Sequence, residues 1–489
     1  WGPDSLPTQK DMDVNQRRSV NAIERLARQF KPDRFDADSW VALAKQAGMR
    51  YITFVAKHHN GYCLFDSRHT DFDSVDQPAG RDFVADLVRA ARTADIKIIL
   101  YYSMLDWHHP EYHGEINRYT DYMYDQIHEL CGNYGRIDGI WFDGDWPYPS
   151  RKWRSDRIVE LIREHQPSAV VNDNLGKIEV GPPESDFITF DSKIPGEPPI
   201  VDGQFKAWET CMTIGTSWAY SEDDQPLKST TELVRMLVDI ASKGGNFLLN
   251  VGPMANGEIA SKYSSRLLSI GKWLQINGES IYGTNRSPLG LLPFGRCTAK
   301  GDRLYIHIFD PSTSLTITGL QKTVRSVALL GNGTALSYRQ DRDDLTFDLP
   351  SQYVDPIDTV VVLDVGPALA GSGQQPQGLD AVASVPANMV MIPGGSFEMG
   401  DTFGEGEPEE RPVHTVTIDP FYMGTFEITN SEYCLFLNGA LDQGLIEFRG
   451  GVVYEAGPGR NHSYFSTHAS DSDIQIDRSE EHTSELQSP

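Results

Sequence analysis

The segment from about residue 20 to residue 288 alternates short apolar runs with amphipathic segments, and this alternation constrains the fold more than any other feature. The runs are YITFVAK (51–57), IKIILYYS (96–103), GIWFD (139–143), AVVND (169–173), FITFD (187–191) and NFLLNVG (246–252). Between them lie segments with helical spacing, such as DFVADLVRAARTA (82–94) and STTELVRMLVDIASK (229–243). Strands that are apolar on both faces and alternate with helices predict a parallel sheet. We therefore predict an α/β fold with a (β/α)8-like TIM barrel over residues 1–288. A doubly wound sheet is the alternative, although no Gly-rich phosphate turn follows the first strand.

Polar residues follow the apolar runs where each predicted strand ends. These residues are Lys57-His58-His59, Ser103, Asp143, Asp173, Asp191 and Asn250. In a β/α barrel the carboxyl ends of the strands meet at one face and build the active site. An Asp after a strand is often only the N-cap of the next helix, and this alternative stands for each residue taken singly. The repetition over most of the strands favours a shared functional mouth.

The character of the sequence changes after residue 288. DRLYIHIFD (302–310), SLTITGL (314–320), SVALLG (326–331) and DTVVVLDVG (358–366) alternate apolar and polar residues with turns between them. This pattern predicts an antiparallel β-sandwich over residues 289–366. The stretch from 367 to 386 is rich in Gly, Pro, Gln and Ala, which indicates a linker.

Composition excludes several classes of protein. The chain has 489 residues, with 43 Lys and Arg against 69 Asp and Glu, a formal net charge of -26. Such an acidic balance argues against a nucleic-acid partner and suits a neutral substrate such as a sugar. The sequence contains no run of 18 apolar residues, so it predicts no membrane-spanning helix. The five cysteines are widely spaced, without the Cys or Cys/His spacing of a zinc site or disulfide framework.

The residue types expected at the mouth fit glycoside hydrolysis. Two carboxylates across a cleft can act as nucleophile and general acid, and aromatic rings can stack on the apolar face of a sugar. Tyr101, Trp141 and several other aromatic residues lie in this region, although most of them are expected to be core. The pair His58-His59 could instead bind a metal. Adjacent residues on one strand point to opposite faces, however, so one ion could not easily be held by both.

Several motifs together resemble the α-L-fucosidases of glycoside hydrolase family 29. They are AKHHNGYCLFDS (56–67), TDFDSV (70–75), YYSMLDWHHPEY (101–112), GIWFDGDW (139–146), WETCMTIGTSWAY (208–220) and KGGNFLLNVGP (243–253). The resemblance covers residues 1 to about 366 in the family's order. It implies a barrel followed by a β-sandwich, and a retaining exo-enzyme that releases terminal L-fucose from fucosylated oligosaccharides or glycoconjugates. It implies no metal and no organic cofactor.

The resemblance also implies roles for particular residues. Asp143 matches the family's nucleophile, and a hydrogen-bonded strand end would keep this carboxylate ionised. His58, His59, Tyr101 and Trp141 match sugar-binding positions. Asn174 occupies a place where some relatives have Arg, and it is a further substrate-binding candidate.

Two residues compete for the role of general acid and base. Asp191 is preferred because it ends a predicted strand at the mouth. Glu209, in the Trp-Glu-x-Cys motif of the family, is the alternative, and it could equally be a structural ion-pair partner. A retaining site needs the acid about 5–5.5 Å from the nucleophile, which sequence does not reveal.

The beginning of the chain departs from the family pattern. Members usually carry a Phe-x-x-His-Trp-Gly motif whose His binds the sugar, followed by an acid–tryptophan pair that clamps the ring. This chain begins at Trp1-Gly2 and continues with Asp11 and Asp13 without another Trp. We therefore expect an N-terminally truncated barrel whose first strand is cut. The resemblance favours a periplasmic or secreted location.

The last region resembles another family. ANMVMIPGGSFEMGD (387–401) and the stretch after it resemble the start of the formylglycine-generating, sulfatase-modifying enzymes, which predicts a partial α+β domain over 387–477. The family's reactive cysteines belong to a part not matched, so Cys434 is given no such role. The end, RSEEHTSELQSP (478–489), looks like a translated sequencing adaptor, and with the start at Trp1 it suggests an incomplete microbial assembly.

Three functions remain open at this stage. The favoured one is a retaining α-L-fucosidase. The second is a fucose- or glycan-binding protein with impaired catalysis. The absence of the acid–tryptophan pair that clamps the sugar ring favours this function. The third is a sulfatase-maturation protein with an appended sugar domain.

Overall fold

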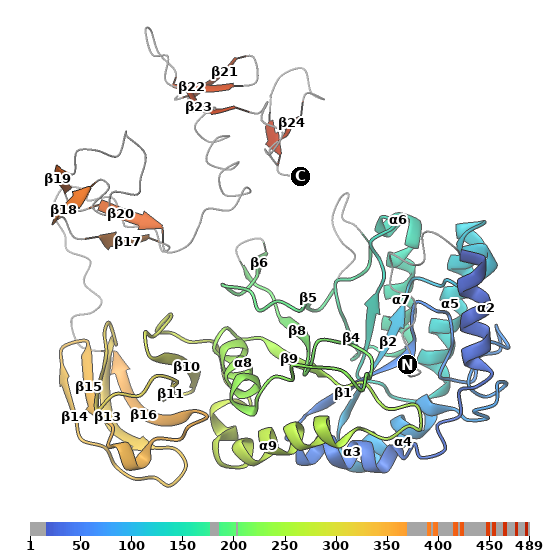
Figure 1. Cartoon of the computed structure of the whole chain (residues 1–489), viewed down its shortest axis with the longest axis horizontal. Coiled ribbons are helices and arrows are strands. Elements are labelled where there is room, and N and C mark those ends of the chain that lie inside the picture. The colour runs from blue at the N-terminus through green and yellow to red at the C-terminus, as the bar shows by residue number, and fades with distance from the viewer. Residues whose placement is uncertain are drawn as a thin grey trace. The chain divides into compact units, whose positions relative to one another are not determined.

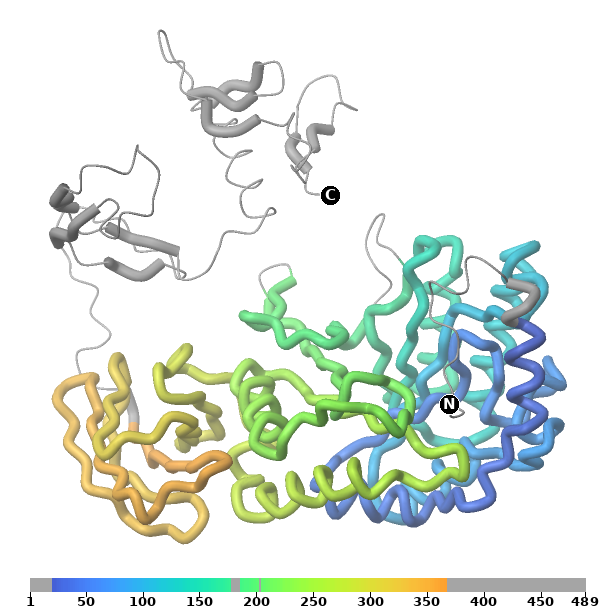
Figure 2. Tube along the Cα trace, viewed as in Figure 1, coloured from blue at the N-terminus to red at the C-terminus, as the bar shows by residue number. Residues whose placement is uncertain are grey.

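The computed structural model describes residues 16–176, 185–201 and 204–368, and beyond them the backbone of short strands (Figure 2). The chain divides into two compact units, residues 1–373 and 374–489. The stretch 1–15, with Trp1, Asp11 and Asp13, lies outside the described residues, as do most of 369–489 and Cys434.

Among the residues that the structure describes, seven parallel strands form the sheet of the barrel (Figure 1). β1 pairs with β2, β2 with β3 and β3 with β4, while β5, β8 and β9 form a second parallel set. A parallel bridge between Asn172 and Phe187 joins the two sets. The strands are β1 (Tyr51–Lys57), β2 (Lys97–Ser103), β3 (Gly139–Asp143), β4 (Val170–Val171), β5 (Ile188–Asp191), β8 (Trp208–Thr213) and β9 (Asn246–Asn250).

The order of these strands decides between the two predicted architectures. Each strand lies beside the next parallel strand along the chain, without the reversal of order that defines a doubly wound sheet. The sequential order is that of a β/α barrel. Among the described residues the barrel has seven strands, and the edges of β1 and β9 carry no further strand.

Helices cover the outside of this sheet, and capping residues fix where several of them begin. Asp36 accepts a hydrogen bond from the amide of Asp38 at the start of α3, and Asp82 does the same for Ala85 in α4. Ser229 and Glu232 form a capping box on α8. The helices are α2 (Gln16–Ala27), α3 (Ala37–Gln46), α4 (Phe83–Ala94), α5 (Ile116–Asn133), α6 (Ser150–Trp153), α7 (Ser155–His165), α8 (Thr230–Ser242) and α9 (Ser261–Asn277).

An antiparallel sandwich follows the barrel, as the alternating pattern predicts. One sheet has the order β10-β11-β16-β13 and the other β12-β15-β14. Apolar side chains from both sheets, such as Ile306 of β11 and Phe347 of β15, share one buried core. The strands are β10 (Gly295–Lys300), β11 (Arg303–Ile308), β12 (Ser314–Ile317), β13 (Lys322–Leu329), β14 (Tyr338–Asp341), β15 (Asp344–Asp348) and β16 (Thr359–Ala368). Two short strands, β6 (Ile200–Val201) and β7 (Gln204–Phe205), form a separate hairpin.

The second unit is described only as short antiparallel strands. β17 pairs with β20, β18 with β19, β22 with both β21 and β23, and β24 with β25. Their bounds are β17 (Met389–Ile392), β18 (Gly395–Met399), β19 (His414–Ile418), β20 (Phe421–Gly424), β21 (Ile446–Arg449), β22 (Val452–Glu455), β23 (Ser463–Ser466), β24 (Gln475–Asp477) and β25 (Glu485–Gln487). Any helices of the predicted α+β domain lie outside the described residues.

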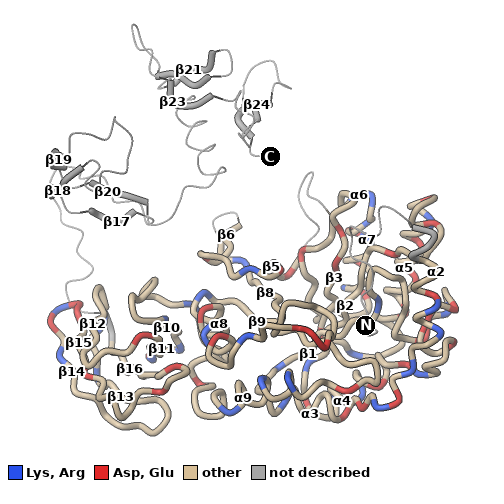
Figure 3. Tube along the Cα trace, in the orientation of Figure 1, with Lys and Arg blue, Asp and Glu red and all other residues tan. Residues whose placement is uncertain are grey.

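Acidic and basic residues are interspersed along α3 and α4, where Asp38 pairs with Arg89 (Figure 3). Mixed charge of this kind differs from the basic footprint that phosphate binding needs. No helix in the described part of the chain is long and apolar enough to cross a membrane.

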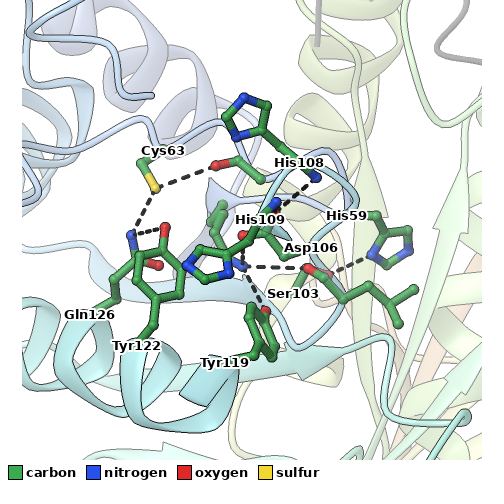
Figure 4. A network of polar contacts seen from close by, with 12 residues as sticks. His59, Cys63, Ser103, Asp106, His108, His109, Tyr119, Tyr122 and Gln126 are labelled. Carbon is green, nitrogen blue, oxygen red and sulfur yellow. Dashed lines mark hydrogen bonds and ion pairs between the residues drawn. The ribbon is translucent and has the colours of Figure 1, made fainter. Parts of the chain in front are cut away.

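A buried ion pair joins the end of β1 to the loop after β2 (Figure 4). Lys57 Nζ lies 3.1 Å from Asp106 Oδ2, and the two side chains are 0% and 2% exposed. Lys57 also donates to the Tyr119 hydroxyl, while Asp106 Oδ1 accepts the amides of His108 and His109. Because both charges are removed from water, each depends on the other for compensation.

Replacing Asp106 with Asn tests how much the ion pair of Lys57 and Asp106 contributes to the free energy of unfolding. Asn keeps the oxygen that accepts the two amides but leaves the Lys57 ammonium buried without its counter-charge, so we expect unfolding to require about 3–5 kcal/mol less. Urea denaturation of both chains measures the difference. Asp302→Asn removes a carboxylate from an exposed pair with Arg325 and should cost less than about 1 kcal/mol. Equal effects of the two substitutions would contradict the prediction.

Candidate active site

The carboxyl ends of the parallel strands open onto one cavity of about 600 Å³. Six of the eight predicted site residues line it: His58, His59, Tyr101, Trp141, Asp143 and Asp191. The lining residues come from β1, β2, β3, β5, β8 and β9, from the helices α3, α4 and α9, and from the loops between these elements. The sheet thus brings together most of the side chains that the sequence places at strand ends.

Asp143 is the last residue of β3 and is the best-supported carboxylate of the cavity. Its Oδ2 accepts a hydrogen bond from the Tyr101 hydroxyl, and its Oδ1 accepts the amide of Gly144 at 2.7 Å. Gly144 has a φ of 77°, which a residue with a Cβ adopts only with strain. The turn therefore aims one backbone donor back at the carboxylate. Each carboxylate oxygen of Asp143 thus has a hydrogen-bond donor.

His59 lies on the other side of Asp143. Its Nε2 is 3.6 Å from Asp143 Oδ2, and its Nδ1 is 2.6 Å from the Ser103 hydroxyl. Burial lowers the pKa of His59 to about 4, with Lys57 acting in the same direction and Asp143 opposing it. The ring is therefore neutral at pH 7 and can exchange hydrogen bonds with a neutral ligand.

Aromatic rings form a continuous stack along the cavity wall. His58 stacks on Tyr101 with ring centroids 5.4 Å apart and planes 3° apart, and Tyr101 stacks on Trp141 at 5.4 Å and 16°. Burial lowers the pKa of His58 well below its usual value, so this ring is neutral as well. The stack places apolar ring atoms and polar ring edges side by side along the wall of the cavity.

The expectation that His58 and His59 point apart is wrong. Their ring centroids are 4.1 Å apart, and one nitrogen from each ring lies within 4.8 Å of a carboxylate oxygen of Asp143. The alternation of faces applies inside a strand, whereas β1 ends at Lys57 and both histidines lie in the turn after it.

Asp191 ends β5 and lines the cavity. Although the residue keeps solvent access, the pocket walls around its carboxyl and the nearby carboxylates of Asp143 and Asp173 raise the pKa of Asp191 to about 6. Ser192 follows in a left-handed conformation with φ of 54° and also lines the cavity. A non-glycine residue held in this conformation indicates a turn fixed by its surroundings.

Glu209 lies behind the wall of the cavity and is not among its lining residues. It is 2% exposed, and it accepts hydrogen bonds from the Tyr51 hydroxyl and, at 2.9 Å, from Trp141 Nε1. Burial raises the pKa of Glu209 to about 7, with Asp191 adding to the rise and the two donors opposing it. The geometry makes it a support for the aromatic wall.

Asn174 and Asp145 support the backbone instead of facing the cavity. Asn174, predicted to bind substrate, donates to the Phe142 carbonyl at 3.1 Å and is not a lining residue. Because β4 ends at Val171, that carbonyl needs a side-chain partner. Asp145, two residues after Asp143, accepts the amide of Gly176 at 2.9 Å, while Pro149 occupies the N-cap of α6.

Several residues of the site escaped the role assignments made from sequence. Tyr51 donates to Glu209 from the start of β1, Trp218 and Ser192 line the cavity, and Asn250 donates to the Trp218 carbonyl at 2.8 Å. Asn250 and Ser103 stand at strand ends, which is a signal that sequence carries. Tyr51 and Ser192 carry none, because their roles arise from contacts between distant strands.

Family models match both parts of the chain. Residues 7–279 match the model described as Alpha-L-fucosidase, and residues 377–487 match the Sulfatase-modifying factor enzyme 1-like domain. The second match extends into the stretches expected to be a linker and a translated adaptor, and nothing supports the adaptor interpretation.

Named relatives and solved structures agree with the first match. An α-L-fucosidase of Branchiostoma floridae is 30% identical over 337 residues, which are 62% of this chain and 74% of that protein. The tissue α-L-fucosidase of Bos taurus is 35% identical, over 51% of this chain and 55% of that protein. The structure of α-L-fucosidase isoenzyme 1 from Paenibacillus thiaminolyticus has a TM-score of 0.67 at 34% identity, covering 70% of this chain and 90% of that one. A trapped covalent intermediate of a family 29 α-L-fucosidase from Bacteroides thetaiotaomicron has a TM-score of 0.65 at 25% identity, covering 73% and 86%.

The pKa of Glu209 makes stability depend on pH. The folded state binds this proton more tightly than the unfolded chain does, because the pKa rises from 4.5 to about 7. Stability from this group is therefore complete below pH 4.5 and is lost as pH rises through 7. In the parent, this group should lower the free energy of unfolding by about 3 kcal/mol between pH 4.5 and 8. Glu209→Gln should lack this part of the decrease, which urea denaturation over the same pH range measures. The exposed Glu222→Gln is the control and should keep the parent's pH dependence; a Glu209→Gln profile parallel to the parent's would refute the prediction.

Proposed function

Because the chain belongs to the α-L-fucosidase family, we propose that it hydrolyses the bond to a terminal L-fucose by double displacement, with Asp143 as nucleophile and Asp191 as acid and base. The observation that carries the proposal is the placement of these two carboxylates in one cavity with contrasting environments. Asp143 accepts two hydrogen bonds, whereas Asp191 has a pKa of about 6. Such a contrast separates the two roles that a retaining site needs.

In the first step a carboxylate oxygen of Asp143 attacks the anomeric carbon. The glycosidic bond breaks, and the leaving oxygen takes the proton of Asp191. In the second step Asp191, now ionised, accepts a proton from water as the water oxygen attacks the same carbon and releases Asp143. The donors on Asp143, from Tyr101 and Gly144, hold its carboxylate in place at the end of β3.

The neutral rings of His58 and His59 and the faces of Tyr101 and Trp141 support fucose binding. Rings that carry no charge recognise a neutral sugar without the cost of desolvating an ion. His58, Tyr101 and Trp141 line the cavity next to one another and offer aromatic carbon atoms for packing against the apolar face of the sugar. His59, 3.6 Å from Asp143, supplies a hydrogen-bonding nitrogen near the point of attack.

Glu209 is the weaker candidate for the acid. Its pKa of about 7 would suit the role, but both carboxylate oxygens are engaged by Tyr51 and Trp141. A general acid must reach the leaving oxygen, and Glu209 does not line the cavity. We propose that it positions Trp141.

Asp143→Asn tests the nucleophile. The amide cannot form the glycosyl ester, so kcat/KM for an aryl α-L-fucoside should fall by several orders of magnitude. Asp145→Asn, two residues away and outside the cavity, is the matched control and should stay within about tenfold of the parent. Similar losses in both variants would overturn the assignment. If the parent is folded and binds L-fucose in a titration without turnover, the barrel is a sugar-binding module instead.

Asp191→Asn and Glu209→Gln separate the two candidate acids. Without its acid the enzyme should lose about 10²- to 10⁴-fold on alkyl fucosides, which need protonation, and much less on 2,4-dinitrophenyl α-L-fucoside. We expect this pattern for Asp191→Asn, together with rescue by azide and loss of the high-pH limb of kcat/KM. Glu209→Gln should slow both substrates alike. The reverse assignment of patterns would make Glu209 the acid.

A further inference from the structure

We propose that His58, His59 and Asp143 form a binding site for one divalent transition-metal ion of the Zn²⁺ class, and that the bound ion excludes the sugar. The metal would act as an inhibitor at this site and would take no part in hydrolysis. The binding half of the proposal stands on geometry alone, and the exclusion half rests on the proposed function.

The first observation is the convergence of three ligand atoms. One nitrogen of each imidazole and one oxygen of Asp143 all lie within 4.8 Å of one another, and His59 Nε2 is 3.6 Å from Asp143 Oδ2. Zinc bonds of about 2.0–2.2 Å at tetrahedral angles place two ligand atoms about 3.4 Å apart. The pair from His59 and Asp143 is therefore close to the spacing that one ion imposes. Small rotations of the side chains would complete the set.

The second observation is the hydrogen bond that orients His59 (Figure 4). The Ser103 hydroxyl donates its single proton to the Leu105 carbonyl at 3.0 Å. It must therefore accept at 2.6 Å from His59, which places the ring proton on Nδ1. Nε2 then carries its lone pair on the side of Asp143. Metal-binding histidines are held in this way, with the far ring nitrogen donating to a fixed oxygen.

The support behind Ser103 is buried and charged. The Leu105 carbonyl also accepts from Lys57 Nζ at 3.4 Å, and Lys57 is the ammonium paired with Asp106. The orientation of His59 is thus linked through one hydroxyl to a network with almost no solvent contact. A ligand held before the ion arrives loses less freedom on binding.

The third observation is access. All three ligands line the cavity, and the side chains of His59 and Asp143 keep 12% and 18% of their surface. Three protein ligands leave a fourth position for water. Two imidazoles and one carboxylate favour Zn²⁺ over Mg²⁺ or Ca²⁺, which select oxygen ligands. An ion here would occupy the atoms proposed to attack and bind the sugar.

Calorimetric titration of ZnCl₂ into the full chain, treated with chelator and then dialysed, tests the site. We expect one ion per chain, with affinity reduced at least tenfold in His59→Ala and in His59→Gln. Ser103→Ala should weaken binding about 10- to 100-fold, as loss of an orienting partner does. His69→Ala is the matched control, because His69 also lies beside two carboxylates, Asp125 and Glu129, but outside the cavity. MgCl₂ should give no binding heat at the same concentrations.

A Zn²⁺ titration that is unchanged in both His59 variants, each checked for its circular dichroism spectrum, would overturn the site. Saturating L-fucose should lower the apparent Zn²⁺ affinity of the parent, and an unchanged affinity would overturn the exclusion half. The titration needs no turnover. A chain that binds Zn²⁺ through His59 but hydrolyses no fucoside therefore counts against the proposed hydrolase and supports the metal site.

Discussion

The buried pair of Lys57 and Asp106 is the interaction on which the geometry of the site depends. It joins the last residue of β1 to the loop after β2, and residues of the site lie next to both partners in the sequence. His58 and His59 follow Lys57 directly, while Ser103 and Leu105 precede Asp106. A buried ion pair of this kind is weak evidence for stability, since apolar residues often replace such pairs without loss. The pair matters here because it positions the ends of β1 and β2, which form one wall of the cavity.

Three carboxyl groups near the cavity show how surroundings divide one chemical group into different roles. Asp143 is covered by donors, Asp191 lies among walls and like charges, and Glu209 is buried behind the aromatic stack with both oxygens engaged. Hydrogen bonds to the charged form, desolvation and like charge act in different proportions on each. The roles proposed for them, as nucleophile, acid and structural support, therefore rest on the neighbours of each carboxyl group. The carboxyl groups themselves are chemically alike.

Sequence predicts the strands and the residues at their ends well, because both are local properties. YITFVAK, GIWFD and the start of NFLLNVG coincide with β1, β3 and β9, and Asp143 and Asp191 end their strands as expected. AVVND yields only the two residues of β4, since Asn172 turns its amide to the backbone of Phe142 instead of continuing the strand. The position of Glu209 behind Trp141 and the use of Asn174 on Phe142 are not local. They depend on which side chains from different strands meet, and a single sequence carries no record of that.

The parallel sheet also distributes rigidity unevenly over the site. Asp143 stands on β3, which is paired on both sides by β2 and β4, and Asp191 stands on β5, held by β8 and by the bridge to Asn172. His58, His59 and Asn250 stand at the ends of β1 and β9, whose outer edges carry no strand among the described residues. Backbone with fewer hydrogen-bond partners opens more readily. The carboxylates proposed for chemistry therefore lie on the best-supported strands. On the side of β1, the Ser103 hydroxyl contacts His59 Nδ1 at 2.6 Å and links its ring to the Leu105 carbonyl and the buried Lys57.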